Sequence, residues 1–391
     1  MSKKILYLAN VDWFFRSHRL SIAEAAKDAG FKVHIACKFT EHRSEFEEMG
    51  FKTHDLSLSR GGTNPFAEMR AFWEIANTIS RLNPDILHLI SVKPLLYGGI
   101  LSQLYSVQRI VASVSGLGYI FTATSAKAKL LKHLLIKLYR VALNHNNTSV
   151  IFQNKSDLDL FERLEIVDSE QTVLIPGSGI DLEMFSQQPE PRGDEKIVMF
   201  VGRILVDKGV GEFVSAARIL KDKLDQVRFV LVGDCDPENP NSYSRNEISN
   251  WVLSGVIEHW GSTKDVGEWM ARASLVVLPS YREGLPKVLI EAAAIGRAVV
   301  TTDVPGCRDA ILPGHTGLLV KPKNAIDLAR AIKSLLANVK LRREFGEHGR
   351  KHAENKFDIR DVVSVHIRLY QGSYKDDMSQ KFTSYKSGGD F

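Results

Sequence analysis

The 391-residue chain contains only three cysteines, which lie far apart in the sequence. Cys37, Cys235 and Cys307 match no metal-binding spacing and form no disulfide framework of the kind that staples small secreted domains. We therefore expect reduced thiols and a cytoplasmic protein. No apolar run approaches the roughly eighteen residues that a membrane-spanning helix needs, so any contact with a membrane should be peripheral.

Acidic residues are absent from Ile86 to Ser156, although the net charge of the whole chain is only +5. Because basic residues continue through this stretch, we expect positive charge to gather on one side of the first half. Such a side suits an anionic membrane surface, and we expect no nucleic-acid partner. The basic residues are Lys93, Arg109, Lys127, Lys129, Lys132, Lys137, Arg140 and Lys155.

Short apolar runs alternate with helix-period segments along the whole chain, a pattern that predicts an α/β fold with parallel sheets. The length favours two domains, and the polar segment 186–195 interrupts the alternation as a linker. Two facing Rossmann-like domains would place ligands at the carboxyl ends of their strands. The predicted units are an N-terminal domain (1–185), the linker, a C-terminal domain (196–358), a crossover helix (359–372) and a disordered tail (373–391).

The strand-like runs are the main evidence for this organisation. In the first half they are Ile5–Ala9, Lys32–Ala36, Ile86–Ile90, Ile110–Val114, Ser149–Phe152 and Thr172–Ile175. In the second half they are Ile197–Val201, Arg228–Val232, Val256–Trp260, Leu275–Leu278, Ala298–Thr302 and Gly317–Val320.

Two glutamates flank a turn and the start of a helix just after the run Leu275–Leu278. Glu283 comes before the helix and Glu291 lies inside it, while Pro286 occupies a favoured first helical position. Free amides around Gly284 to Val288 would form an anion site at the helix start. Carboxylates for hydroxyls and amides for phosphate suit a nucleotide-sugar. The simpler alternative is a pair of solvated helix acids, which the surrounding apolar residues disfavour.

A basic motif, Gly202-Arg203 followed by Lys208-Gly209, comes directly after the first strand of the second half. This is the position where a doubly wound domain binds phosphate. Arg203 offers a planar fork and Lys208 a point charge, and both could stabilise a departing diphosphate. The alternative is a surface basic pair beside a turn.

The motifs of the second half, in order and spacing, resemble glycosyltransferase family 4. They extend from Ile197 to Val320 and include Glu283-Gly284, Glu291-Ala292 and the segment from Gly314 to Val320. The resemblance implies the GT-B fold and transfer with retention of configuration. It also implies that Arg203 and Lys208 bind the donor diphosphate, that Glu283 contacts the transferred sugar and that Glu291 holds the ribose. Gly202, Gly284, Leu285 and Pro286 complete the predicted donor site.

Three motifs of the first half lie at Asp12–Arg19, Ser115–Tyr119 and Pro176–Asp181. They resemble those of a capsule and O-antigen subgroup that builds oligosaccharides on polyprenyl diphosphate. The resemblance implies that the acceptor binds here, and it departs from the usual motif at one position, where Ser115 replaces a histidine. His18 lies in a neighbouring motif, and packing on Phe14 is its alternative role. The predicted acceptor residues are Asp12, His18, Arg19, Ser115, Gly116 and Gly118.

Leucines recur at helical spacing through residues 125–143, with Lys129, Lys132 and Lys137 among them. This pattern suits either a buried crossover helix with solvated lysines or a helix that lies on anionic lipid. We take the three lysines as predicted membrane contacts at the inner face of the cell membrane.

The sequence thus predicts a hexosyltransferase that moves a HexNAc or hexose from a UDP-sugar to a polyprenyl-diphosphate-linked or other glycan acceptor. Two Asp-x-Asp motifs, at 234–236 and 157–159, are poor metal sites because of their context, so we expect neither a metal nor a cofactor. The absence of Gly-x-Gly-x-x-Gly after the first strand disfavours a dinucleotide oxidoreductase. A UDP-sugar 2-epimerase and a non-catalytic nucleotide-sugar-binding protein remain as alternatives.

Overall fold

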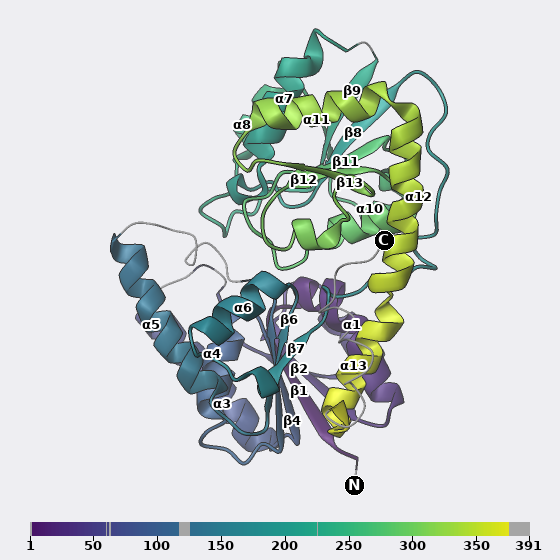
Figure 1. Ribbon diagram of the computed structural model, residues 1–391. Helices are drawn as coiled ribbons and strands as arrows, with labels where there is room; N and C mark the ends of the chain where they lie inside the picture. Colours follow the sequence, from purple (N-terminus) through teal and green to yellow (C-terminus); the bar gives the residue numbers. More distant parts are fainter. Residues whose placement is uncertain (1, 60, 62–63, 117–125, 225, 375–391) are drawn as a thin grey trace.

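The computed structural model describes residues 2–59, 61, 64–116, 126–224 and 226–374. These residues form two α/β domains, one above the other in Figure 1, each built on a parallel sheet. The predicted α/β class and GT-B arrangement are confirmed. The predicted tail lies outside the described residues except for Ser373 and Tyr374.

The described N-terminal sheet has the strand order β3-β2-β1-β4-β5-β6-β7, and every pair in it is parallel. Its inner strands are apolar runs that are buried on both faces, as parallel sheets require. The sequence analysis missed β3, because this edge strand reads Lys-Thr-His-Asp and carries no apolar signal. The strands are β1 (Lys4–Val11), β2 (Lys32–Lys38), β3 (Lys52–Asp55), β4 (Ile86–Ile90), β5 (Arg109–Val114), β6 (Thr148–Phe152) and β7 (Thr172–Leu174).

Helices cover both faces of this sheet, and several of them were not predicted. Gly98 and Gly99 let α4 lie directly against β4 and α5, since a Cβ on either would meet Leu89 or Ala142 within 3 Å. The helices are α1 (Asp12–Asp28), α2 (Arg43–Glu48), α3 (Pro65–Leu82), α4 (Val92–Leu101), α5 (Ala126–Leu143) and α6 (Lys155–Arg163).

The C-terminal sheet has the order β10-β9-β8-β11-β12-β13 among the described residues. Its strands are β8 (Lys196–Val201), β9 (Val227–Val232), β10 (Glu258–Gly261), β11 (Leu275–Leu278), β12 (Val299–Thr302) and β13 (Gly317–Val320). Around it lie α7 (Val210–Lys221), α8 (Arg245–Leu253), α9 (Val266–Ala271), α10 (Lys287–Ile295), α11 (Ala325–Ala337) and α12 (Val339–Lys356).

The last helix, α13 (Ile359–Gln371), returns to the N-terminal domain and packs beside α1, as Figure 1 shows along its right side. Its buried face, including Val365 and Leu369, joins the apolar core that covers β1 and β4. Tyr370 also bonds through its hydroxyl to Nδ1 of the buried His88, at 2.7 Å. The predicted crossover helix therefore braces the first domain.

The two chain crossings between the domains run side by side. The N–H of Ile180 donates to the carbonyl of Phe357 at 2.7 Å, and the N–H of Ile359 donates to the carbonyl of Ile180 at 3.0 Å. Gly179 has φ +75°, and a Cβ there would meet the Ile359 Cα at 2.8 Å, so only glycine allows this close pairing. The two crossings are thus tied to each other by backbone hydrogen bonds.

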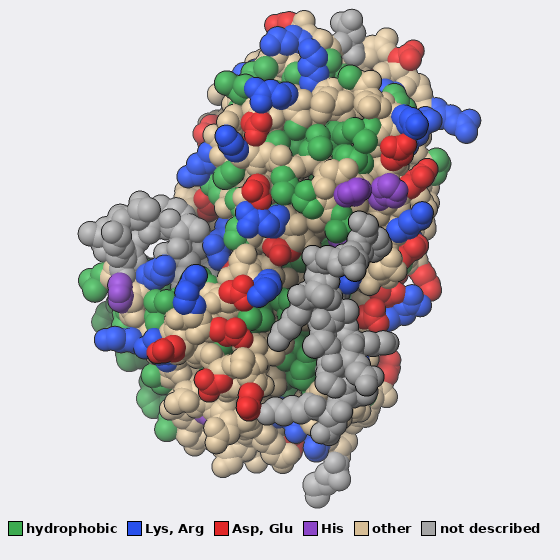
Figure 2. All heavy atoms as spheres, in the orientation of Figure 1, with side chains coloured by type: hydrophobic (Ala, Val, Ile, Leu, Met, Phe, Trp, Pro, Cys, Tyr) green, Lys and Arg blue, Asp and Glu red, His purple; other side chains and the backbone are tan. Residues whose placement is uncertain are grey.

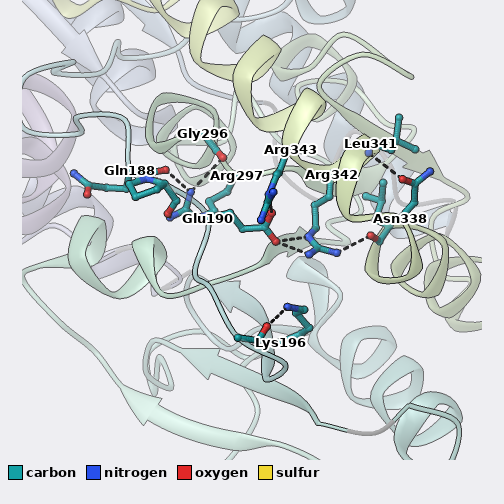
Figure 3. Close-up of polar contacts among 12 residues, drawn as sticks. Gln188, Glu190, Lys196, Gly296, Arg297, Asn338, Leu341, Arg342 and Arg343 are labelled. Carbon is teal, nitrogen blue, oxygen red and sulfur yellow. Dashed lines mark hydrogen bonds and ion pairs between the residues drawn. The ribbon is translucent and has the colours of Figure 1, made fainter.

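The segment predicted as the linker contacts the C-terminal domain at residues 188–190 (Figure 3). Arg297, which is buried, donates to the carbonyls of Gln188 and Pro189 at 2.8 and 2.9 Å. The Glu190 carboxylate accepts from Nε of Arg342 at 2.7 Å and from Nε of Arg343 at 3.3 Å. These contacts make this part of the segment move with the C-terminal domain.

Candidate active site

The loop between β11 and α10 carries the predicted donor carboxylate and is held from several sides. The N–H of Glu283 donates to the Pro305 carbonyl at 3.2 Å, and the N–H of Tyr281 donates to the Asp207 carbonyl at 2.9 Å. The Tyr281 hydroxyl donates to Glu212 at 2.8 Å. Because these bonds join the loop to three other segments, the position of Glu283 is well defined.

Lys208 and Glu283 meet although they are 75 positions apart: the Nζ–Oε1 distance is 2.5 Å. Gly209 explains how the turn that carries Lys208 approaches the donor loop. Its φ is +72°, and a Cβ there would lie 2.1 Å from the Pro279 carbonyl oxygen. Glycine at this position therefore lets the two loops pack backbone to backbone, as the motif requires.

Arg203 follows β8 and Gly202, and it lies at the same edge of the sheet. Its Nη1 contacts the Asp236 carboxylate at 2.7 Å, and its guanidinium carbon lies 5.9 Å from the centre of the Trp13 ring in the N-terminal domain. Asp236 is one acid of an Asp-x-Asp motif that the sequence analysis disfavoured as a metal site. The described residues contain no cluster of three or more His, Cys, Asp or Glu side chains able to hold a metal ion.

Glu291 is 8% exposed and lies in the second turn of α10. Burial raises the pKa of its carboxyl, and Lys287 at 3.5 Å partly opposes this shift. Lys287 also donates across the domain boundary to the Ser17 carbonyl at 3.1 Å. Leu285 and Pro286, between the two glutamates, are buried and fix the start of α10.

The start of α1 faces this C-terminal site. Trp13 lies under Arg203, Ser17 accepts from Lys287, and His18 feels the charges of both Lys287 and Lys208. Burial first, and then the charges of Arg19 and of these two lysines, lower the pKa of His18 to about 3, so the ring is neutral. Its Nδ1 faces the Phe14 carbonyl at 3.2 Å, which assigns the proton to Nδ1 and leaves Nε2 as an acceptor.

His18 also stacks on Phe14, with ring centroids 4.3 Å apart, as the alternative role required. His18 can therefore both pack on Phe14 and lie near Lys287 and Lys208 of the C-terminal domain. Arg19 is 2% exposed and donates to the His18 carbonyl at 2.8 Å and to the Ser115 hydroxyl at 3.3 Å. Arg19 therefore holds the two predicted acceptor residues His18 and Ser115 in place. Burial lowers the pKa of its own guanidinium to about 10.

Asp12 is fully buried, and its carboxylate binds the loop after β2 instead of the C-terminal domain. Its Oδ2 accepts from the backbone N–H groups of Thr40, Glu41 and His42 at 2.7 to 2.9 Å. Burial by itself would raise its pKa, but these bonds and one from the Thr40 hydroxyl lower it to about 2. Asp12 thus organises the loop after β2, and any influence on an acceptor is indirect.

Of the remaining predicted residues, some lie where the two domains touch and others lie on the outer surface. Ser115 and Gly116 lie against Gly284 of the donor loop, whereas Gly118 lies outside the described residues. On α5, Lys137 is exposed and Lys132 half-buried; the side chain of Lys129 is not described.

Sequence reasoning missed the residues that join the two domains, because their partners are distant in the chain. Asn154 and Asp157 contact Arg282 and Gly284, and Lys38 pairs with Glu238 at 2.9 Å. One signal was available: Asp157 is the first acid after the long acid-free stretch, which suggests a specific cationic partner.

Loops at the carboxyl ends of both parallel sheets therefore meet, with cations, two carboxylates and a helix start on one side and the start of α1 on the other. This arrangement defines a GT-B glycosyltransferase. The family models for glycosyl transferases group 1 and glycosyl transferase 4-like match residues 182–352 and 4–154. The chain belongs to glycosyltransferase family 4.

A curated relative matches nearly the whole chain. It is the N,N'-diacetylbacillosaminyl-diphospho-undecaprenol alpha-1,3-N-acetylgalactosaminyltransferase of Campylobacter jejuni, 30% identical over 385 residues, or 95% of this chain and 100% of the relative. The matched models and this relative are all transferases, which confirms the glycosyltransferase prediction over the epimerase alternative.

Solved structures show the same fold at lower identity. Sucrose-phosphate synthase from Thermosynechococcus elongatus has a TM-score of 0.77 and 22% identity, covering 95% of this chain and 99% of that chain. Anabaena HepE in complex with UDP has a TM-score of 0.73 and 19% identity, covering 94% and 100%.

Proposed function

We propose that this protein transfers a HexNAc or hexose from a UDP-sugar to a polyprenyl-diphosphate-linked glycan, with retention of configuration and without a metal ion. The observation that carries the proposal is the contact between Lys208 and Glu283 beside Arg203, opposite the start of α1. The Campylobacter relative, named for a diphospho-undecaprenol substrate, and the UDP complex of the Anabaena protein support the choice of acceptor and donor.

Donor binding would exchange the partners of these charges. The diphosphate takes Arg203 and Lys208, and Glu283, released from Lys208, accepts hydroxyls of the sugar. Glu291 holds the ribose from inside α10. Fixed cations at the diphosphate stabilise the transition state more than the ground state, because negative charge grows there as the bond breaks.

The acceptor hydroxyl approaches from the side of His18. The bond from the sugar C1 to the diphosphate oxygen breaks, a bond from C1 to the acceptor oxygen forms on the same face, and the hydroxyl proton goes to the departing diphosphate. His18 is neutral, so its Nε2 can accept a hydrogen bond from the acceptor but cannot serve as an acid. Closure of the domains excludes water and suppresses donor hydrolysis.

The exposed face of α5 supports binding to the inner face of an anionic membrane. Leu130, Leu131 and Leu134 are 75%, 41% and 53% exposed, beside Lys132 and Lys137. Hydrophobic and basic side chains lie together along the left edge of the lower domain in Figure 2. Within the described residues, no helix combines the length and apolar character needed to cross a bilayer.

A second apolar stripe lies on α3, where Phe66, Met69 and Trp73 are 78%, 55% and 63% exposed. Their spacing places them on one side of the helix. Aromatic side chains beside basic ones are typical of a surface that enters the lipid headgroup region.

A thermal-shift screen with UDP-, GDP- and ADP-sugars tests the donor, and mass spectrometry with polyprenyl-diphosphate acceptors tests transfer. We expect a shift with a UDP-sugar, a product one sugar heavier, an α-linkage from an α-donor by NMR, and the same rate after EDTA treatment. Glu283→Gln should abolish transfer with only mild loss of UDP affinity. Conversion of UDP-HexNAc without acceptor to its 2-epimer would contradict the proposal.

Membrane binding is tested separately with vesicles that contain an anionic phospholipid. Replacing Lys129, Lys132 and Lys137 with glutamine should reduce sedimentation with these vesicles while transfer to a short soluble acceptor continues. Unchanged sedimentation would exclude these lysines as the membrane contact.

A further inference from the structure

The start of α6 in the N-terminal domain lies directly against the donor loop of the C-terminal domain. Nδ2 of Asn154 donates to the Gly284 carbonyl at 2.7 Å. Asp157, one turn further on, pairs through its carboxylate with the guanidinium of Arg282. In Figure 1, α6 is at the top of the lower domain, facing the upper one.

Asn154, the cap of α6, and Asp157 in its first turn are both buried and hydrogen-bonded. Asn154 is 2% exposed; its Oδ1 accepts from the N–H of Asp157 at 2.8 Å as the helix cap, and its Nδ2 also reaches the Asp157 carboxylate at 3.1 Å. Serine or aspartate could cap the helix equally well. Aspartate has no donor for the Gly284 carbonyl, and a serine hydroxyl ends one bond short of the Nδ2 position, so the bond across the boundary explains the amide side chain.

The ion pair between Asp157 and Arg282 depends on the domain arrangement. The side chains are 1% and 19% exposed, and they belong to different domains. A buried charge without its partner strongly destabilises the arrangement that buries it. The pair therefore favours the closed arrangement only while both members are present. When the domains separate, water can reach both groups.

Glu283 stands between the two anchored residues. The residue before it, Arg282, is held by Asp157, and the carbonyl of the residue after it, Gly284, is held by Asn154. The backbone of Gly284 also lies against Ser115, since a Cβ at this position would be 2.6 Å from the Ser115 carbonyl oxygen. The place of the Glu283 carboxylate is thus tied to contact with the N-terminal domain.

We propose that Asn154 and Asp157 are positioning residues that hold the Glu283 loop in its transfer-competent place only when the two domains are closed. The proposal rests on the transferase function above. It couples orientation of the donor sugar to docking of the acceptor domain, so that an open enzyme binds the nucleotide without activating the sugar. Such coupling protects the donor from hydrolysis.

Two substitutions remove the contacts with little other change. Asp157→Asn removes the charge, and Asn154→Ser keeps the helix cap but removes the donor to Gly284. Asp159→Asn is the matched control, because Asp159 lies on the same helix and, within the described residues, pairs with the exposed Lys155 instead of the donor loop. A melting curve for each variant shows whether it is folded.

The expected result separates nucleotide binding from transfer. For Asp157→Asn and Asn154→Ser, UDP affinity by calorimetry stays within about twofold of wild type, whereas kcat for transfer falls on the order of 100-fold, as for misplaced catalytic groups. The ratio of donor hydrolysis to transfer rises. Adding Arg282→Gln to Asp157→Asn should cause no further loss, because both changes break one pair.

Small-angle X-ray scattering tests the contact of Asn154 and Asp157 with the donor loop without relying on transfer. Both without ligand and with UDP bound, wild type and Asp159→Asn should have a smaller radius of gyration than Asp157→Asn. Identical scattering curves for the three proteins, or an equal loss of kcat in Asp159→Asn, would overturn the proposal. If wild type transfers no sugar from UDP-sugars but the scattering difference is present, the proposed function fails. The role of Asn154 and Asp157 in holding the domains closed is then still supported.

Discussion

Gly284→Ala isolates the close approach of the two domains. Gly284 does not have a positive φ, so its backbone accommodates alanine. The added Cβ would lie 2.5 Å from Oε1 of Gln153 and 2.6 Å from the carbonyl oxygen of Ser115. Both atoms belong to the N-terminal domain, so the clash exists only in the closed arrangement.

The size of the effect follows from this overlap. Gln153 can move its flexible end, but the Ser115 backbone must shift by about 0.8 Å to restore an ordinary contact of about 3.4 Å. Overpacking of this kind costs about 1–3 kcal/mol, which reduces the closed population roughly five- to 150-fold. We expect kcat/KM for transfer to fall by this factor, with UDP affinity unchanged.

Steady-state transfer assays and calorimetry with UDP measure the two quantities. Gly267→Ala is the control, because its Cβ would have its nearest neighbour in the Phe185 ring at 3.5 Å, an ordinary contact, and Phe185 packs in the core of the C-terminal domain. Full transfer activity in Gly284→Ala would refute the requirement for this closed arrangement. Loss of UDP binding in parallel with transfer would show instead that the donor loop itself had been damaged.

Three further changes test individual side chains. Glu291→Gln should weaken UDP binding about tenfold by calorimetry, the effect of one charge-assisted hydrogen bond. Burial raises the pKa of the Glu291 carboxyl in the folded state, so wild type gains stability as the pH falls through that pKa. The substitution should remove this gain. Asp12→Asn should cost about 2 kcal/mol in urea unfolding at pH 7, because folding lowers the carboxyl pKa from 3.8 to about 2, and this difference should vanish as the pH falls from about 4 to 2. Asp236→Asn should leave UDP binding intact or strengthen it by up to about fivefold, since it frees the partly exposed Arg203; weaker binding, matched by Asp234→Asn, would instead favour a metal at the Asp-x-Asp motif.

The sequence predicts well those features that depend on local patterns. Apolar runs such as Leu275–Leu278 are buried strands because helices cover both faces of a parallel sheet. The turn motifs place Lys208 and Glu283 in the loops that follow strand ends. The edge strand β3 and the polar helix α12 were missed, since neither has the apolar periodicity that such predictions use. Asp12 was misleading in another way: a conspicuous acid after the first strand serves a buried loop.

The contacts between domains were beyond sequence reasoning for a different reason. Asn154 resembles any helix cap and Arg282 any exposed loop cation until the fold brings α6 and the donor loop together. The separation of 125 positions between Asp157 and Arg282 carries no periodic signal. Such pairs depend on the relative placement of two finished domains, which no local pattern encodes.

The charges of the site are already paired before a donor arrives. Lys208 pairs with Glu283, and Arg203 with Asp236, so each cation of the predicted diphosphate site rests on a carboxylate. A diphosphate must displace these carboxylates, and its charge is greater than that of either one. In the proposed function, the displaced Glu283 would then accept sugar hydroxyls, because Asp207, Glu212 and Pro305 hold its loop at the strand end. Binding of the nucleotide would thus release the group that we propose orients the sugar, and the contact of Asn154 and Asp157 with the same loop would fix its position.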